Sequence, residues 1–557
     1  MLDSNSLKAV VLCNSRVYPI AAAILYKTLY LESKVERSPE PHRDSPWKSR
    51  IYPIHLCVHV KNIFVVRSHD VSCYRAEFCN GFMKFLSYLF RVAVNLQHFH
   101  WWHERYMPGE VLHQLFKYRP QASVHIASWK VALCEKLNSK LSSAPQLSTI
   151  RSIEAEWHLG EYDRPIRPNA AASYAGLIDI IYRSHNLESL SLISWGNWGP
   201  GRSGYIRFEE VPPDLEREEF EARENRRGLI TLSEGKSLPR VKNLHFERMR
   251  FGPHQSTLWA AQLQWKMIKY LSLISVDWSH LLPKVTFPGC FHELETLEMS
   301  IAEPDSQGES DYSEYLERVE QFHGFLKELP PLQMFMGYGF PQQTLGVLAE
   351  YHAKSLRHLR FRYDLFADHG EPGRVGPPIS IHNLGTLADQ LPNLLSLGIN
   401  LSWGADWELP CDRLASIVRH NHLQHLELNM RALPERSGGW PYPDVDEGTC
   451  RALVTAFDEA CLNLLSFHFI VGDWFPFGLP SCKMFHEEAF LVGERDYMGH
   501  MRFSNIWHQM QHGELMRLGT FVQRIPPHEL KERWPTNLRE DIEGRIGNLF
   551  WGKLLKE

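Results

Sequence analysis

Hydrophobic residues recur along this chain in one short pattern, apolar-x-x-apolar-x-apolar, in which x is mostly polar. The last four positions of each copy alternate between apolar and polar residues, which is the period of a short β-strand with one buried face. The clearest copies span Leu187–Leu192, Ile268–Leu273, Leu294–Met299, Leu356–Phe361, Leu394–Ile399, Leu423–Leu428 and Leu464–Phe469. Looser copies start at Val60, Leu96, Ile150, Val241 and Leu332, and a further strand is expected at Val124–Ile126. The pattern therefore predicts about a dozen short strands.

The spacing between copies indicates a repeat architecture. The copies at Val241, Ile268 and Leu294 start 27 and 26 residues apart, within the roughly 20–29 residues of a leucine-rich repeat. Other intervals are longer, and each unit of such a solenoid buries its apolar positions by stacking on its neighbours. Helices between the strands are expected at Tyr174–Ser184, Tyr315–Leu329, Gly385–Gln390 and Thr449–Cys461. We therefore predict an α/β fold, an irregular leucine-rich-repeat solenoid with parallel strands on its concave side and helices and loops outside.

The strand pattern divides the chain into three parts. Residues 1–31 hold an apolar stretch interrupted by polar residues and are expected to form a short helical segment. Residues 45–475 carry the repeat array. The pattern fades beyond it, so residues 476–557 are expected to cap the open end of the array and to finish in a helix at Leu538–Leu555.

The composition narrows the functional classes. The chain has 60 Lys and Arg against 65 Asp and Glu, so it lacks the bulk positive charge that drives non-specific binding to nucleic acid. No apolar run is long enough for a membrane-spanning helix. The ten cysteines lack paired spacing, which is typical of reduced thiols inside the cell. We expect a cytoplasmic or nuclear protein that binds neither nucleic acid nor membranes.

The first thirty residues carry a second pattern. Ser6–Leu12 leads into Arg16 and then into the apolar run Ile20–Leu29. This arrangement resembles the second half of an F-box, although the first helix of an F-box is not found. With an irregular leucine-rich array behind this segment, the whole chain resembles the F-box/leucine-rich-repeat proteins that are abundant in filamentous fungi, with a truncated F-box.

That resemblance implies a role in ubiquitin transfer. In the family, the F-box docks on a Skp1-like adaptor and brings the protein into a cullin-type (SCF) ubiquitin ligase as its substrate-recognition subunit. Carried over to this chain, the residues facing the adaptor would be Leu7, Leu12, Ile20, Leu25 and Tyr26.

Histidines are the main candidates for chemistry, because the chain has 29 of them. The densest groups are His98-x-His100-x-x-His103, His420-x-His422-x-x-His425 and His55-x-Cys57-x-His59. Zinc sites require four protein ligands, or three and a water, and no Cys-x-x-Cys pair or His-Glu-x-x-His helix accompanies these groups. Nor does the sequence contain a nucleophile elbow or a phosphate-binding glycine loop. We therefore predict no metal, no cofactor, no catalytic residue and no enzymatic activity.

The repeat pattern also predicts which residues face away from the core. The polar x positions should line the concave face and bind a target protein, with these as the leading candidates: His98, His100, Lys242, His245, Lys269, Tyr270, Glu295, Glu298, Arg357, His358, Arg360 and His425. Tryptophans follow several strands and predict an aromatic edge for a partner, at Trp102, Trp195, Trp198, Trp278, Trp403, Trp407 and Trp474. The alternative is that these indoles close the core beneath the loops.

The leading functional hypothesis is thus a protein-interaction module, a substrate receptor that binds a target on the concave repeat face. One alternative is a leucine-rich-repeat scaffold without adaptor binding, because half of the F-box is missing. A metal-dependent enzyme that uses the His98–His103 group is a distant third.

Overall fold

The computed structural model describes the following residues of the chain: 27–33, 57–67, 80–102, 107, 109–130, 145–158, 170–195, 232–247, 249, 251, 253–274, 276–301, 310–362, 387–402, 417, 422–431, 466–471, 487–495, 501–511 and 514–524. The chain divides into two compact units. Unit 1 comprises residues 1–197, 204–299 and 328–330, and unit 2 comprises residues 198–203, 300–327 and 331–557.

Unit 1 is built on a parallel β-sheet whose strands follow the order of the chain. Each strand pairs in parallel with the next. The strands are β1 (Thr28–Ser33), β2 (Asn62–Arg67), β3 (His98–Trp102), β4 (Ser123–Lys130), β5 (Ile150–His158), β6 (Ser189–Trp195), β7 (Asn243–Glu247), β8 (Tyr270–Ile274) and β9 (Thr296–Ser300). A parallel pair needs a crossover connection between its strands, and the sequential order is that of a repeat solenoid.

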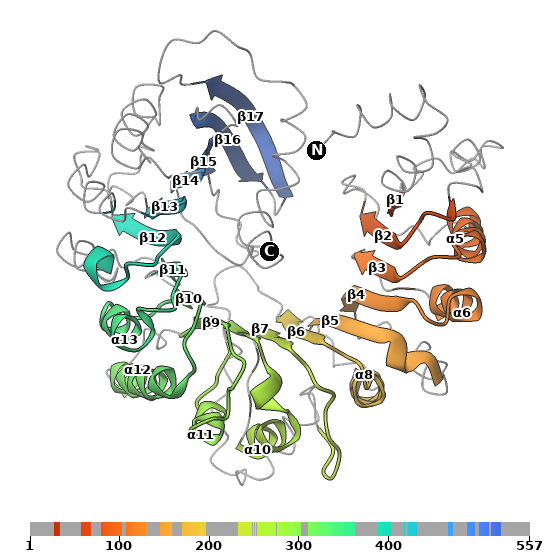
Figure 1. Ribbon diagram of the computed structural model, residues 1–557, viewed down its shortest axis with the longest axis horizontal. Coiled ribbons are helices and arrows are strands. Elements are labelled where there is room, and N and C mark those ends of the chain that lie inside the picture. Colours follow the sequence, from red (N-terminus) through yellow and green to blue (C-terminus); the bar gives the residue numbers. More distant parts are fainter. Residues whose placement is uncertain are drawn as a thin grey trace. The chain divides into compact units, whose positions relative to one another are not determined.

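The crossovers of unit 1 contain helices, and these helices lie on one face of the sheet (Figure 1). They are α5 (Asn80–Val92), α6 (Gly109–Tyr118), α8 (Ala170–Arg183), α10 (Pro253–Gln262) and α11 (Leu282–Val285), with 3₁₀ turns η2 (Pro145–Thr149) and η3 (Trp265–Met267). Adjacent α5 and α6 are tied at the surface, where Arg91 Nη2 donates to Tyr118 Oη at 3.0 Å.

The core of unit 1 lies between the sheet and these helices. On α5, the buried side chains Phe82, Leu86 and Leu89 recur at helical spacing, which gives the helix one apolar face. On β3, alternate side chains Phe99 and Trp101 are buried, which is the period of a strand with one buried face. The rings of Phe90 and Phe99 meet edge to face at 5.2 Å and connect the helix to the sheet.

The start of several strands is fixed by a repeated backbone arrangement. The carbonyl of Lys61 accepts hydrogen bonds from the amides of both Gln97 and His98, at 2.8 and 2.9 Å. The carbonyl of Lys242 does the same for Lys269 and Tyr270. Because the two amides come from the next strand of the sheet, this shared acceptor sets the strand register.

Asparagines before the first apolar position of a copy also bridge successive repeats. Asn95 donates its side-chain amide to the carbonyl of Val58 at 2.6 Å, and Asn186 donates to that of Ser148 at 2.9 Å. In unit 2, Asn393 donates to the carbonyl of Lys354 at 3.0 Å. An asparagine in a turn therefore donates a hydrogen bond to a backbone carbonyl that would otherwise need water as its partner.

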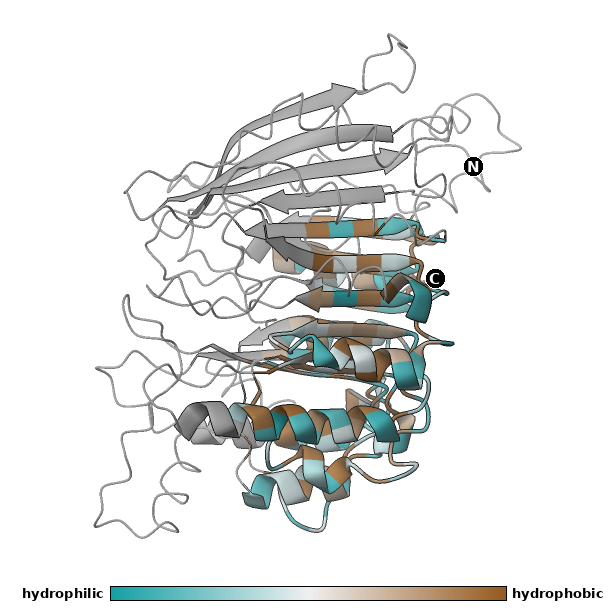
Figure 2. Cartoon of the chain, turned by 90° about the vertical axis from the view of Figure 1, so that its left-hand side faces the viewer, coloured by the Kyte–Doolittle hydropathy of each residue, from teal (hydrophilic) through white to brown (hydrophobic). Residues whose placement is uncertain are grey.

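Unit 2 repeats the same construction. Its strands β10 to β14 are parallel and sequential, and β14 to β17 are antiparallel. Its elements are α12 (Ser310–Glu328), β10 (Met334–Tyr338), α13 (Gln343–His352), β11 (His358–Arg362), β12 (Ser396–Ser402), β13 (His425–Arg431), β14 (Ser466–Val471), β15 (Glu487–Arg495), β16 (Met501–Gln511) and β17 (Glu514–Arg524). Hydrophobic and hydrophilic residues alternate along β11 and β13 (Figure 2).

A buried histidine connects the helices of unit 2 to its sheet. His352, at the end of α13, accepts the amide hydrogen of Leu332 at Nδ1 (3.3 Å), and its Nε2 contacts the carbonyl of Leu326 at 3.1 Å. Only the tautomer that carries hydrogen on Nε2 makes both bonds. Burial lowers the pKa of this imidazole, which agrees with the neutral form.

The expected strands are confirmed. Every copy of the apolar pattern, clear or loose, coincides with one of the parallel strands β2 to β14, including the isolated prediction at Val124–Ile126. The expected helices at Tyr174–Ser184 and Tyr315–Leu329 correspond to α8 and α12, and residues 387–390 are helical as expected. The helices expected at 449–461 and 538–555 lie outside the described residues. The α/β class and the parallel open sheet are therefore established.

Two expectations near the ends of the chain need correction. Thr28–Leu31 was assigned to a helical segment but forms strand β1, in which Leu29 and Leu31 are buried and Tyr30 is 61% exposed. Alternation of this kind favours a strand, and pairing with β2 extends the parallel ladder to residues before 45. The cap expected over 476–557 contains the antiparallel strands β15 to β17, which the apolar pattern did not predict.

Two further sequence expectations concern the membrane and the cysteines. No helix among the described residues combines the length and the apolar character that crossing a membrane requires. The described cysteines, Cys57 and Cys290, are free and buried. Burial raises the pKa of the Cys290 thiol to about 11, so it remains protonated at neutral pH.

Candidate interaction surface

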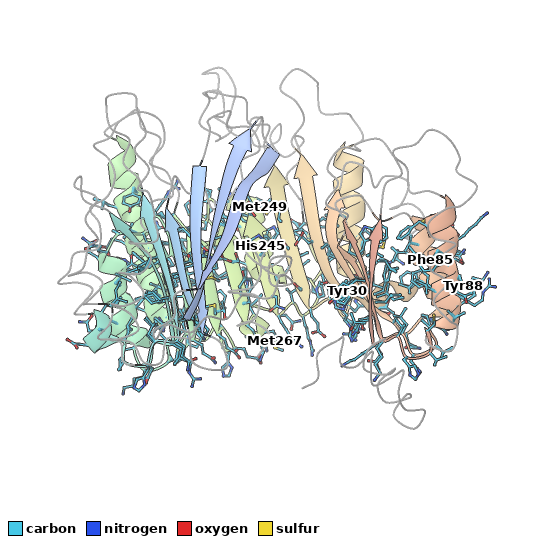
Figure 3. All side chains as sticks on the ribbon, turned by 90° about the horizontal axis from the view of Figure 1, so that it is seen from above. Tyr30, Phe85, Tyr88, His245, Met249 and Met267 are labelled. Carbon is cyan, nitrogen blue, oxygen red and sulfur yellow. The ribbon has the colours of Figure 1, made fainter. Side chains whose placement is uncertain are left out.

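The sheet face of unit 1 that points away from the helices is lined by polar and aromatic side chains. On β3, His98 and His100 are partly exposed, whereas Phe99 and Trp101 between and beyond them are buried. The described helices of this unit lie on the other face of the sheet (Figure 1). Figure 3 shows the same division, with Tyr30 and His245 beside the strands and Phe85 on helix α5. We call this surface the polar face.

The structure places all twelve predicted face residues on strands or directly before them. Eight lie within strands: His98, His100, His245, Tyr270, Glu298, His358, Arg360 and His425. Four lie at most two residues before a strand: Lys242, Lys269, Glu295 and Arg357. None of the twelve is buried. Their accessibility agrees with a binding face, and protein binding by them stays a prediction.

Four aromatic rings form a stack across the first four strands. The register places Tyr30, Phe64, His100 and His125 opposite one another on β1 to β4. Successive ring centroids are 5.0, 4.0 and 4.3 Å apart, with interplanar angles of 19°, 5° and 10°. Stacked rings present a rigid surface that is part apolar and part polar, which is the character of residues that dominate protein interfaces.

A histidine pair adjoins this stack. His98 Nδ1 lies 3.3 Å from His125 Nε2, and His125 Nδ1 lies 3.0 Å from Ser152 Oγ on β5. Burial, together with the nearby His98, lowers the pKa of His125 to about 4. His125 is therefore a neutral imidazole at neutral pH, held in place by a serine.

A second polar network crosses β7, β8 and β9. His245 Nδ1 lies 2.7 Å from Ser272 Oγ, which donates to Glu298 Oε2 at 2.9 Å. Tyr270 Oη donates to the same carboxylate oxygen at 2.5 Å. Ser272 is fully buried, and its hydroxyl group donates its hydrogen bond to the carboxylate of Glu298. The arrangement therefore orders the polar face and lacks the exposed, base-activated hydroxyl that nucleophilic catalysis requires.

The charged residues along the polar face are largely paired with one another. Lys242 Nζ lies 3.3 Å from Glu188 Oε2, and Lys269 Nζ lies 3.7 Å from Glu293 and 3.6 Å from Glu295. These pairs are exposed and contribute little stability. They do reduce the charge that the lysines present to a partner.

Unit 2 has its own polar sheet residues. Arg360 on β11 reaches across β12 to Glu427 on β13, with Arg360 Nη2 2.8 Å from Glu427 Oε1. In the neighbouring register position, His358 lies opposite Ser396. His358 Nδ1 and Ser396 Oγ are buried and have no hydrogen-bond partner among the described residues.

The predicted aromatic edge is only partly within the described side chains. Trp278 is 2% exposed and packs in the core of unit 1, so its assignment to an exposed edge was wrong and it closes the core instead. Trp102 and Trp195 end strands β3 and β6. The remaining edge residues lie outside the described residues, namely Trp198, Trp403, Trp407 and Trp474. The adaptor-facing candidates Leu7, Leu12, Ile20, Leu25 and Tyr26 also lie outside them.

Sequence reasoning missed the partners that neighbouring strands contribute. His125 was expected only as part of a loosely marked strand, yet it joins His98 and His100. Ser152 was not singled out either, and Glu427, expected on the concave face, is 2% exposed. The alternation within each strand predicts which face they occupy, but contact between strands depends on the register, which a single strand does not specify.

The chain was compared with models of known protein families and with curated proteins. No model of a known protein family matches the chain. A search of curated proteins likewise finds no match.

Proposed function

We propose that this chain is a protein-binding solenoid of the leucine-rich-repeat type that captures a target protein on its polar face. The observation that carries the proposal is the one-sided sheet of unit 1. Parallel sheets normally have both faces covered, whereas the described helices of this unit cover one face and leave the other lined with polar and aromatic side chains. Such a face is suited to a folded partner or an extended peptide.

The stack that begins at Tyr30 supplies the expected anchor. Tyr30 is 61% exposed at one end, while Phe64, His100 and His125 behind it are held by ring contacts and by the strand register. A rigid aromatic side chain loses little conformational freedom on binding. Truncation of such an anchor commonly costs about 2 kcal/mol or more of binding free energy.

A matched pair of tyrosines tests the proposal. Proteins captured by the full-length chain from its own cells would be quantified by mass spectrometry for the wild type, Tyr30→Ser and Tyr351→Ser. Tyr351 is 43% exposed on helix α13, away from the strands. A genuine target should be depleted at least tenfold with Tyr30→Ser and retained with Tyr351→Ser. Equal capture by all three chains would exclude the stack as the binding site.

We further propose that the target is presented for ubiquitin transfer through a Skp1-like adaptor. This step is supported by the resemblance of Ser6–Leu12 and Ile20–Leu25 to an F-box. Thr28–Leu31 is left out of the resemblance because it belongs to strand β1. Removal of residues 1–26 should abolish co-purification with the adaptor and leave target capture unchanged. If the intact chain never binds an adaptor, the scaffold function without ubiquitin transfer is the correct one.

A further inference from the structure

Three histidines gather on the polar face of unit 1. His98 and His100 come from β3 and His125 from β4, and one ring nitrogen of each lies within 4.8 Å of those of the other two. The register explains the gathering, because His100 lies directly opposite His125 and His98 lies opposite Ser123, two residues earlier on β4. Residues two apart on a strand share a face, so all three side chains project from the same side of the sheet.

The spacing of one pair in this triad, His98 and His125, fits two ligands of a tetrahedral metal ion. Zinc binds imidazole nitrogen at about 2.0–2.1 Å with tetrahedral geometry, so two such ligands are about 3.3 Å apart. The separation between His98 Nδ1 and His125 Nε2 is 3.3 Å. The ring of His100 stacks on that of His125 and would have to turn about its Cβ–Cγ bond to direct a nitrogen to the same ion. That torsion is broad for histidine.

The surroundings of the triad also favour metal binding. A histidine ligand usually has its second nitrogen hydrogen-bonded to an oxygen, which selects the tautomer that binds the metal. His125 Nδ1 has this contact with Ser152 Oγ at 3.0 Å, which leaves Nε2 as the ligand atom. Elsewhere on this face His245 contacts Ser272 and has the carboxylate of Glu247 3.6 Å away. At the triad each of these imidazoles has another imidazole beside it, with His98 3.3 Å from His125 and the rings of His100 and His125 stacked at 4.3 Å.

We propose that His98, His100 and His125 bind one divalent transition-metal ion of the zinc class. Three imidazoles complete three of the four tetrahedral positions, and the fourth remains open to water or to an oxygen or nitrogen ligand from outside. Imidazole ligands suit Zn²⁺, Cu²⁺, Ni²⁺ and Co²⁺ and do not suit Mg²⁺ or Ca²⁺. The site would cross-link β3 to β4, and it shares His100 and His125 with the aromatic stack.

The test uses the full-length chain freed of metal by chelation and titrated with Co²⁺ and with Zn²⁺. Four-coordinate Co²⁺ absorbs visible light far more strongly than six-coordinate Co²⁺, so the spectrum reports geometry as well as binding. The wild type should take up one equivalent with the intense four-coordinate bands. His98→Gln and His125→Gln each remove a ligand and should weaken metal binding by more than about 100-fold. Loss of a residue that only hydrogen-bonds to a ligand already weakens metal binding by roughly 10–100-fold.

Two further variants keep the test decisive. His245→Gln removes a histidine that has the same serine contact and lies outside the triad, so it should bind the ion as the wild type does. Ser152→Ala retains all three ligands and should weaken binding by roughly 10–100-fold. Circular dichroism establishes that each variant is folded, and His98→Gln stands in for His125→Gln if the latter is not. Absence of saturable binding by the wild type, or unchanged binding by the folded triad variants, would overturn the proposal.

Discussion

Arg360 and Glu427 form an ion pair that spans three strands, with Gly398 of the middle strand lying between them. Nε and Nη2 of Arg360 lie 3.1 and 2.8 Å from the same carboxylate oxygen. Glu427 is 2% exposed. A Cβ atom on Gly398 would lie 3.0 Å from Cγ of Arg360, so the glycine gives the arginine its path to the carboxylate.

Glu427→Gln should destabilise unit 2 by about 3 kcal/mol, the lower end of the range for breaking a buried ion pair, because Arg360 retains some contact with solvent. Thermal unfolding should show a midpoint lower by several degrees. The matched control is Glu295→Gln, which removes an exposed carboxylate 3.6 Å from Lys269 and should change stability by less than about 0.5 kcal/mol. Equal effects of the two substitutions would contradict the assigned difference in burial.

Gly398→Ala should also destabilise the protein, by about 1–2 kcal/mol, because the added methyl group displaces the arginine side chain. The effect should be smaller in an Arg360→Ala background, where nothing crosses the glycine. A double-mutant cycle measures this coupling from four unfolding free energies. Additive effects would show that the alanine acts through the backbone alone, and the crossing contact would then be irrelevant.

The sequence predicts the features of this fold that depend on neighbouring residues, and it does not predict the contacts between residues that are far apart in the chain. The strands follow from local alternation, and each parallel strand from β2 to β14 except β4 carries a clear or loose copy of the pattern. Thr28–Leu31 was misassigned because an apolar run beginning at Ile20 fits a helix as well as a strand. Side-chain pairs between strands join residues 27 positions apart in unit 1, as for His98 with His125, and 67 apart in unit 2, as for Arg360 with Glu427. No single repeat length relates them, so only the register brings them together.

The buried imidazole of His352 should be a stability determinant of unit 2. His352→Leu removes the acceptor for the Leu332 amide and the donor to the Leu326 carbonyl, and it leaves both backbone groups without their partner. A buried group left unsatisfied costs about 1–3 kcal/mol. Chemical denaturation should therefore show a loss of roughly 2–4 kcal/mol. His280→Leu, at an exposed position, is the control and should have little effect.

The stability of unit 2 should depend on pH through His358. Burial is the main cause that lowers the pKa of this imidazole to about 4, and His425 and Arg357 lower it further. In the unfolded chain its pKa returns to about 6.5. The unfolded state therefore binds a proton that the folded state does not, so the contribution to stability is complete above pH 6.5 and is lost as the pH falls toward 4.

His358→Gln should accordingly flatten the dependence of the unfolding free energy on pH between 7 and 5, a range chosen to lie above the ordinary pKa values of carboxylates. One histidine changes the slope by at most about 1.4 kcal/mol per pH unit, and partial exposure reduces that figure. Urea denaturation at several pH values measures it, with His280→Gln as the control that should keep the wild-type slope. An unchanged slope in His358→Gln would mean that its imidazole has the same pKa in the folded and the unfolded chain, which would contradict the effect assigned to its burial.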